Sequence, residues 1–175
     1  MLGALSINFL LPSNTFILLN RIAETGAKAS MFGLANFFEA AGAVTAALTA
    51  AIIAVRLRRI RASQLMAPIA LALLLCLTAG IWATIISLTI VTALVTVYNI
   101  ILFSQLQREI PREKIGRVIA VVTTSSAAVM PLGNLVFSKL STTIPTHMLI
   151  WATTITLLVT GLAITIGNRK RGGSV

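Results

Sequence analysis

Six long apolar runs alternate with short polar stretches along the chain. The runs cover approximately residues 2–19, 31–55, 65–80, 83–106, 118–140 and 148–167. A helix needs roughly 20 apolar residues to cross a bilayer, where its backbone polar groups must be satisfied internally. The pattern predicts an all-α membrane protein, with one domain over residues 1–175, six transmembrane helices and a short cytoplasmic tail at 168–175.

The composition supports this interpretation. Apolar residues make up 57% of the chain and charged residues 10%, and the mean hydropathy is +0.97. Soluble domains average about 45–50% apolar and about 25% charged residues. No basic residue precedes Arg21, whereas a secretory signal begins with a basic region. The first run is therefore predicted to be a retained span.

The first run is less regular than the others, because Asn8, Pro12, Ser13 and Asn14 interrupt it. Two interpretations stay open. It is either a kinked helix that packs against protein, or a broken helix that lines a substrate cavity. The polar stretch Arg21–Ser30 that follows is predicted to be a loop.

Basic residues gather on one side of the predicted topology, with eleven of the fourteen there and three on the other side. The eleven are Arg56, Arg58, Arg59, Arg61, Arg108, Arg112, Lys114, Arg117, Arg169, Lys170 and Arg171, and the three are Arg21, Lys28 and Lys139. Cytoplasmic segments carry the excess of Lys and Arg, so both termini are predicted to lie in the cytoplasm. An odd number of spans would separate the tail cluster from the other two. Orientation by charge also argues against a nucleic-acid partner.

Glu39 is the one acidic residue inside an apolar run. A charged group at the bilayer centre costs roughly 2.5–3.5 kcal/mol on insertion scales, and such groups often serve proton relays. Small residues, including Gly42 and Ala43, surround Glu39 and let helices approach closely. Glu39 is therefore expected to face the helix bundle. Either it couples transport to protons, or it makes a structural hydrogen bond to a neighbouring helix.

The fourth run carries a polar stripe. Thr89, Thr92, Thr96 and Asn99 share one helical face, next to Tyr98. The stripe either forms hydrogen bonds between helices or forms the wall of a substrate cavity.

Several kinds of chemistry lack the residues they need. The chain has no Asp, so carboxylate-held metal–diphosphate chemistry has too few ligands. A zinc site needs more than the one Cys and one His present, and no Gly-x-Ser-x-Gly stretch supplies a hydrolase nucleophile. The lone Cys76 lies in an apolar run, where it is expected to pack as a small apolar residue. We expect no enzyme activity, no metal and no cofactor.

A short charged stretch, Gln107–Val118, separates the fourth and fifth runs. Its Gln107, Pro111, Gly116 and Arg117, with Pro131-Leu132-Gly133 further on, resemble the loop between the tenth and eleventh spans of major facilitator transporters. The resemblance is closest to the drug-efflux branch that includes macrolide and siderophore exporters. The basic stretch after the second run lacks the Gly/Asp/Arg signature that the family often carries there.

The resemblance implies the C-terminal six-helix half of such a transporter, built as two inverted three-helix repeats. It implies a proton-driven exporter of amphipathic small molecules in the cell (inner) membrane. Glu39 is then the proton-coupling candidate, and Thr92, Thr96, Tyr98, Asn99 and Asn134 are the substrate-path candidates. An N-terminal half or a second copy would complete the path.

Two further expectations concern the fifth run and the loop before it. Pro131 should kink the helix, because it removes a hydrogen bond to Ala127. Arg108, Arg112 and Arg117 either clamp an inward-closed state or set topology and contact lipid phosphate. The alternative for the whole chain is a truncated or non-transporting membrane interaction subunit.

Overall fold

The computed structural model describes residues 2–57, 60–78 and 80–172, and over these residues the chain is helical without a β-strand. Five segments of the described chain are long and apolar enough to cross a membrane: Leu2–Thr25, Ser30–Ile52, Ile81–Glu109, Arg112–Thr143 and Thr146–Gly167. The apolar helical segment Ala62–Leu77 is shorter. The prediction of an all-helical chain with long apolar helices is confirmed, and these helices indicate a membrane protein. Arg58 and Arg59 lie outside the described residues.

The first span consists of two helices, α1 (Leu2–Leu10) and α2 (Pro12–Thr25). Pro12 has no backbone N–H to donate, but it is tolerated at the first position of α2. The span ends at Gly26, which has a left-handed φ of 64° and donates its N–H to the Ala23 carbonyl. The predicted loop Arg21–Ser30 was therefore wrong in part, because helix continues to Thr25.

The second and third segments meet at the end of the bundle that carries Arg56. α3 (Ser30–Ile52) is followed by the short α4 (Ala54–Leu57). The 3₁₀ turn η1 (Ala62–Leu65), α5 (Met66–Leu74) and the 3₁₀ turn η2 (Leu75–Leu77) then form one short apolar segment. Nine of its residues are α-helical and seven are in 3₁₀ turns. With rises of 1.5 and about 2.0 Å per residue they extend about 28 Å, slightly less than a hydrocarbon core of roughly 30 Å.

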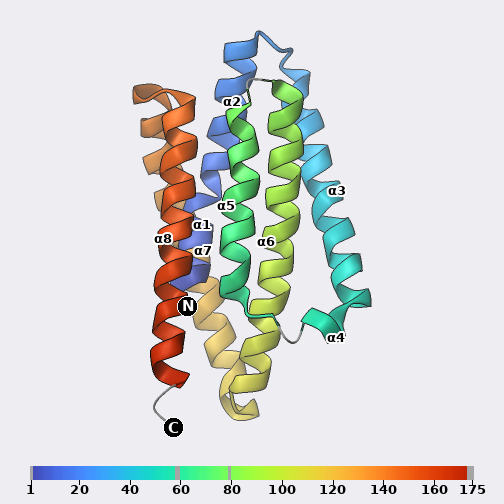
Figure 1. The fold of residues 1–175 in the computed structure, drawn as a ribbon, viewed down its shortest axis with the longest axis vertical. Helices are drawn as coiled ribbons and strands as arrows, with labels where there is room; N and C mark the ends of the chain where they lie inside the picture. The colour runs from blue at the N-terminus through green and yellow to red at the C-terminus, as the bar shows by residue number, and fades with distance from the viewer. Residues whose placement is uncertain (1, 58–59, 79, 173–175) are drawn as a thin grey trace.

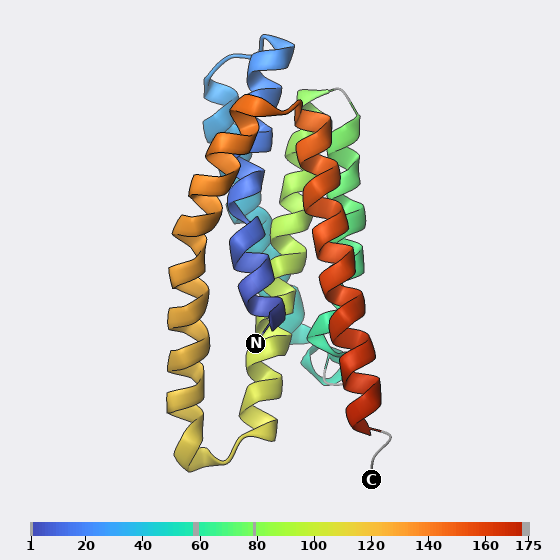
Figure 2. The ribbon, with the colours of Figure 1, turned by 90° about the vertical axis from the view of Figure 1, so that its left-hand side faces the viewer.

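The last three helices are α6 (Ile81–Glu109), α7 (Arg112–Thr143) and α8 (Thr146–Gly172). α6 has 29 residues and α7 has 32, or about 44 and 48 Å at 1.5 Å per residue. Both exceed the hydrocarbon thickness, and the turn between them is the lowest part of the helical ribbon in Figures 1 and 2. α8 extends beyond the predicted end of the sixth span at 167 and takes in part of the predicted tail.

Consecutive segments run in opposite directions along the bundle axis. The α2–α3, η2–α6 and α7–α8 connections lie at the upper end of Figures 1 and 2. α4 and the α6–α7 turn lie toward the lower end, which is also the end toward which both chain termini point. The described part of the three predicted basic clusters therefore lies at one end of the molecule.

The helices form two layers. α3 and α6 make the most extensive contact among the described helices, and α7 packs mainly against α1 and α2. Because α2 also contacts α6, the first layer follows the order α7, α1–α2, α6, α3. α5 and α8 pack against each other and cover this layer from one side, the front in Figure 1. We call the other side of the four-helix layer the open face.

Two glycines allow close approaches to a neighbouring backbone within the first layer. A Cβ on Gly42 of α3 would lie 2.8 Å from Thr89 Cγ2 and 3.0 Å from the Thr89 carbonyl oxygen of α6. A Cβ on Gly133 of α7 would collide with the carbonyl oxygen of Phe9 in α1. Each outer helix of the layer thus meets its inner neighbour at a glycine, in line with the role of small residues in membrane helix packing.

Candidate functional site

Glu39 and Thr92 meet across the α3–α6 contact. The Thr92 hydroxyl donates a hydrogen bond of 2.9 Å to Glu39 Oε2. The pair lies one turn from the close approach of Gly42 to Thr89, and Glu39 is half-buried. Both residues were singled out from the sequence, and the structure brings them together.

The polar stripe of α6 continues from this pair. Thr96 and Asn99 are half-buried like Thr92, and the Thr96 hydroxyl donates to the Thr92 carbonyl at 2.9 Å. Helical spacing puts all three on the flank of α6 between α3 and α1–α2. Ala93 and Val97 lie on the outer flank instead, along a groove beside α3. The stripe therefore borders the open face.

Tyr98 lies apart from this stripe. It is only 2% exposed, and its hydroxyl lies 2.5 Å from the position that a Cβ on Gly3 of α1 would take, which Met66 of α5 also approaches. Tyr98 thus packs inside the bundle, although it is adjacent in sequence to Asn99.

The surface of α3 outside its contact with α6 has two unlike sectors. We measure angles around α3 from Gly42 and add 100° for each residue toward the C-terminus. Side chains at about 60–160° are small or polar, and side chains at about 200–280° are bulky and apolar. The small sector contains Asn36, Ala40, Ala43 and Ala47, with Glu39 at its edge. The bulky sector contains Phe37, Val44, Leu48 and Ile52, which are 59–84% exposed. Because Glu39 meets Thr92, the small sector is the one beside the open face.

The exposed surface of α7 divides in the same way around Gly133. The small or polar sector contains Thr123, Ala127, Asn134 and Ser138, and the bulky sector contains Val121, Leu132, Leu135 and Val136. Measured around the helix from Gly133 in the same way, the two sectors of α7 lie at similar angles to those of α3 measured from Gly42. Asn134 is therefore exposed in the small sector of α7, next to the close approach of Gly133 to Phe9.

The residues of the charged stretch occupy the α6–α7 turn. Gln107 and Arg108 end α6, Pro111 caps the start of α7, and Gly116 and Arg117 lie exposed in its first turns. Arg112 and Arg117 form no ion pair with either glutamate of this turn in the described part of the chain. Their guanidinium groups face solvent at one end of the bundle. α7 continues as helix through Pro131, so the predicted kink stays a prediction.

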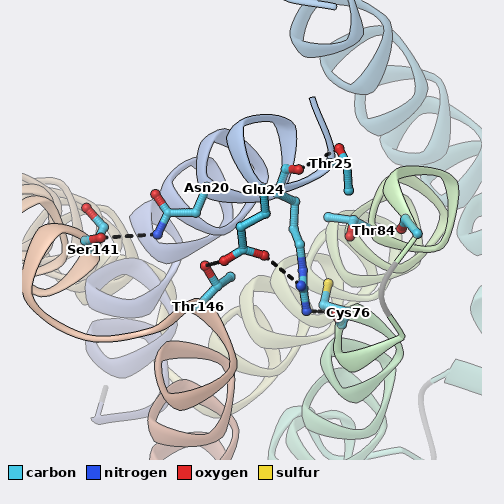
Figure 3. Close-up of polar contacts among 9 residues, drawn as sticks. Asn20, Glu24, Thr25, Cys76, Thr84, Ser141 and Thr146 are labelled. Carbon is cyan, nitrogen blue, oxygen red and sulfur yellow. Dashed lines mark hydrogen bonds and ion pairs between the residues drawn. The ribbon is translucent and has the colours of Figure 1, made fainter. Parts of the chain in front are cut away.

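A second polar cluster, which the sequence did not predict, lies at the opposite end (Figure 3). Arg21 of α2 is buried, and its Nη1 donates to Glu24 Oε2 at 2.7 Å. Its Nη2 donates to the Cys76 carbonyl at 2.8 Å. The Thr146 hydroxyl at the start of α8 donates to the other oxygen of Glu24. The cluster joins α2, η2 and α8.

This cluster has a physical reason in the short third segment. The last carbonyls of a helix have no intrahelical donor, and a cation near them is favourable. Cys76 lies in the final turn of the third segment, so the Arg21 guanidinium supplies that donor and charge. The signal in the sequence was an Arg–Glu pair three residues apart, which fits one turn of continuing helix better than a loop.

Cys76 and His147 are not part of a metal site among the described residues. The Cys76 thiol is buried and lies 3.0 Å from the Ser87 hydroxyl, while His147 is exposed. Across residues 2–57, 60–78 and 80–172, no three His, Cys, Asp or Glu side chains group closely enough to hold a metal ion. Comparison of the chain with protein-family models, curated proteins and solved structures found no match.

Proposed function

We propose that the chain is the C-terminal type of six-helix half of a proton-coupled major facilitator exporter, which moves amphipathic small molecules out of the cell. It sits in the inner membrane with both termini in the cytoplasm. The short third segment crosses together with the five longer ones, so that α1–α2, α3 and α5 form one repeat and α6, α7 and α8 the inverted second repeat.

The packing pattern supports two repeats. The first three segments correspond in order to the last three, so that α1–α2 corresponds to α6, α3 to α7 and α5 to α8. The α3–α6 contact then corresponds to the α7–α1 contact, and the α5–α6 contact to the α8–α1 contact. Likewise, Gly42 against Thr89 corresponds to Gly133 against Phe9. Because the exchanged segments run in opposite directions, the repeats are inverted, as in many transporters.

The observation that carries the proposal is the sidedness of α3 and α7. Lipid favours bulky apolar side chains, whereas small and polar side chains favour helix contact or a watery path. On both helices the small or polar sector borders the open face and the bulky sector turns away from it. A partner half, or a second copy, covers the open face and leaves the substrate path between the two units.

Glu39 is the coupling residue of the proposed exporter. Its carboxyl group borders the open face and accepts a hydrogen bond from Thr92 on a different helix. Gain of a proton would remove the charge and weaken this bond, because charged acceptors make the stronger hydrogen bonds. One proton event would thus change the contact between α3 and α6 at the wall of the path.

The test is dye efflux from proteoliposomes under a pH gradient, with the chain reconstituted alone and with a partner half. Glu39→Gln keeps the size and hydrogen-bonding capacity of the side chain but cannot ionise, and should abolish gradient-driven efflux. Glu109→Gln removes a carboxyl group from the exposed end of α6 and should leave efflux nearly unchanged. Equal efflux by the Glu39 variant and the wild type would contradict the coupling role.

The same open face fits the second candidate, a non-transporting interaction subunit, since small-residue faces bind other helices. The two functions differ in the efflux assay. An interaction subunit would bind its partner through the open face, but no combination of chain and partner would move dye.

A further inference from the structure

An apolar groove follows the outer flank of the α3–α6 contact and ends at an arginine. Its middle section has a volume of about 240 Å³ and lies between Thr45 and Ala46 of α3 and Ala93 and Val97 of α6. A narrower section of about 40 Å³ continues past Ile100 and Ser104 to Arg108. Ala50 and Leu57 line both sections, so the two sections adjoin each other.

The groove exists because its floor is made of small residues. Ala46 and Ala50 of α3 face Ala93 of α6, and bulky exposed side chains such as Leu48 and Ile52 stand on the adjoining surface of α3. The groove therefore lies on the side of the molecule that turns away from the open face. In a membrane this side meets lipid, whose acyl chains fill an apolar depression of this kind.

Arg108 gives the groove a charged end. It lies in the last turn of α6, and its Nε donates to the Ser104 carbonyl at 3.2 Å, which directs the side chain along the helix. No described residue that lines either section is acidic. A guanidinium beside an apolar channel matches a molecule with an anionic phosphate and an apolar tail.

We propose that this groove binds one anionic phospholipid from the leaflet at the arginine-rich end. An acyl chain lies along Ala93, Ala50 and Leu57, and the phosphate contacts Arg108. Anionic lipid would then hold α3 and α4 against the end of α6. The proposal does not depend on transport, since it needs only a chain that lies in a membrane.

The head-group contact is tested by titrating purified, delipidated chain with phosphatidylglycerol or phosphatidylcholine and counting bound lipid by native mass spectrometry. One phosphatidylglycerol should bind at least tenfold more tightly than phosphatidylcholine. Arg108→Gln should remove this preference, Arg108→Lys should keep part of it, and Arg112→Gln, which changes an exposed arginine away from the groove, should keep all of it. Equal losses with Arg108→Gln and Arg112→Gln would mean diffuse charge attraction and would overturn the site.

The tail contact has its own pair of variants. Ala93→Leu fills the middle section and should weaken phosphatidylglycerol binding severalfold. Ala128→Leu makes the same change on an exposed position of α7 and should not. Soluble glycerol phosphate should fail to displace the lipid, and efficient displacement would identify a free-anion site instead. Helical circular dichroism and gel filtration confirm that each variant is folded.

Discussion

At the residue scale, Arg21 shows how a charge can be useful inside an apolar bundle. It is buried between a carboxylate of its own helix and the last turn of the third segment. A buried arginine with both contacts made is tolerated, whereas a single lost partner leaves other polar groups unsatisfied. Arg21 therefore has a structural explanation at the end where basic residues are otherwise few.

Replacing Arg21 by methionine tests this. The variant keeps an unbranched side chain but leaves the Cys76 carbonyl without its donor, which costs about 1–3 kcal/mol for a buried acceptor. Glu24 adds little to this loss, because 44% of its side chain is exposed. Equilibrium unfolding in detergent measures the change in free energy. Lys28→Met, an exposed change near the same end, should be close to neutral, and equal stability of both variants would contradict the role of Arg21.

Other residue-scale expectations depended on which helices pair, and the sequence did not contain this information. Glu39 and Thr92 could each be singled out as polar residues in an apolar run, but their hydrogen bond to each other was found only in the structure. Tyr98 and Asn99 point about 100° apart around α6, but hydropathy alone does not show which neighbouring helices cover each of these two directions. Only the position of α1 and α5 beside α6 places Tyr98 inside the bundle.

At the element scale, glycines decide how closely the helices of the first layer approach. Gly42→Ala and Gly133→Ala should each push a helix pair apart and destabilise the fold by about 1–3 kcal/mol, as overpacking does. Gly116→Ala is the matched control, because nothing lies within 4 Å of the added Cβ. Since alanine is favoured over glycine in a helix by about 1 kcal/mol, the control should be neutral or stabilising.

Thermal unfolding in detergent measures all three glycine variants under one condition. The expected order of midpoint temperatures is Gly116→Ala highest and Gly133→Ala lowest, because a Cβ at Gly133 collides with the Phe9 carbonyl oxygen, whereas a Cβ at Gly42 lies nearest the Thr89 methyl group and 3.0 Å from the Thr89 carbonyl oxygen. A Gly133→Ala variant as stable as the control would show that α7 and α1 do not approach so closely.

Hydropathy predicted the presence and order of the elements, but their ends depended on local chemistry. Gly26 ends α2 later than expected because its left-handed conformation, and not the polarity of Arg21, stops the helix. The third segment runs through residues 62–77 instead of 65–80, since 3₁₀ turns extend α5 at both ends. Polar residues such as Arg21 and Glu24 remain helical when another element supplies their partners.

At the scale of the whole molecule, the two sectors of α3 and α7 make a prediction about surroundings. Spin labels at Leu48 and Leu135, in the bulky sectors, should collide frequently with oxygen dissolved in lipid. Labels at Ala40 and Thr123, in the small or polar sectors, should collide several times less often, because the proposed function covers them with a partner or a watery path. Cys76 is fully buried and can stay in place as the native thiol. Similar oxygen collision rates at all four positions would contradict a covered open face.

The alternation of segments and the clustering of arginines followed from the sequence, because both depend on local composition. The two-layer arrangement did not, since apolar periodicity says that a helix is covered without saying by which neighbour. Gly42 and Gly133 are examples: each is visible in the sequence as a small residue, but its partner helix is set by the tertiary fold.

The lengths of α6 and α7 have one more consequence. A hairpin of about 44 and 48 Å in a hydrocarbon layer of roughly 30 Å extends its tip beyond the hydrocarbon, to the level of the lipid head groups and past it. Displacement in a rotation grows with distance from its centre, so rocking of the bundle about the bilayer centre moves the tip farther than the atoms near that centre. A fluorophore attached at Arg112 would therefore report small rotations of the bundle as a larger displacement than one attached near the bilayer centre.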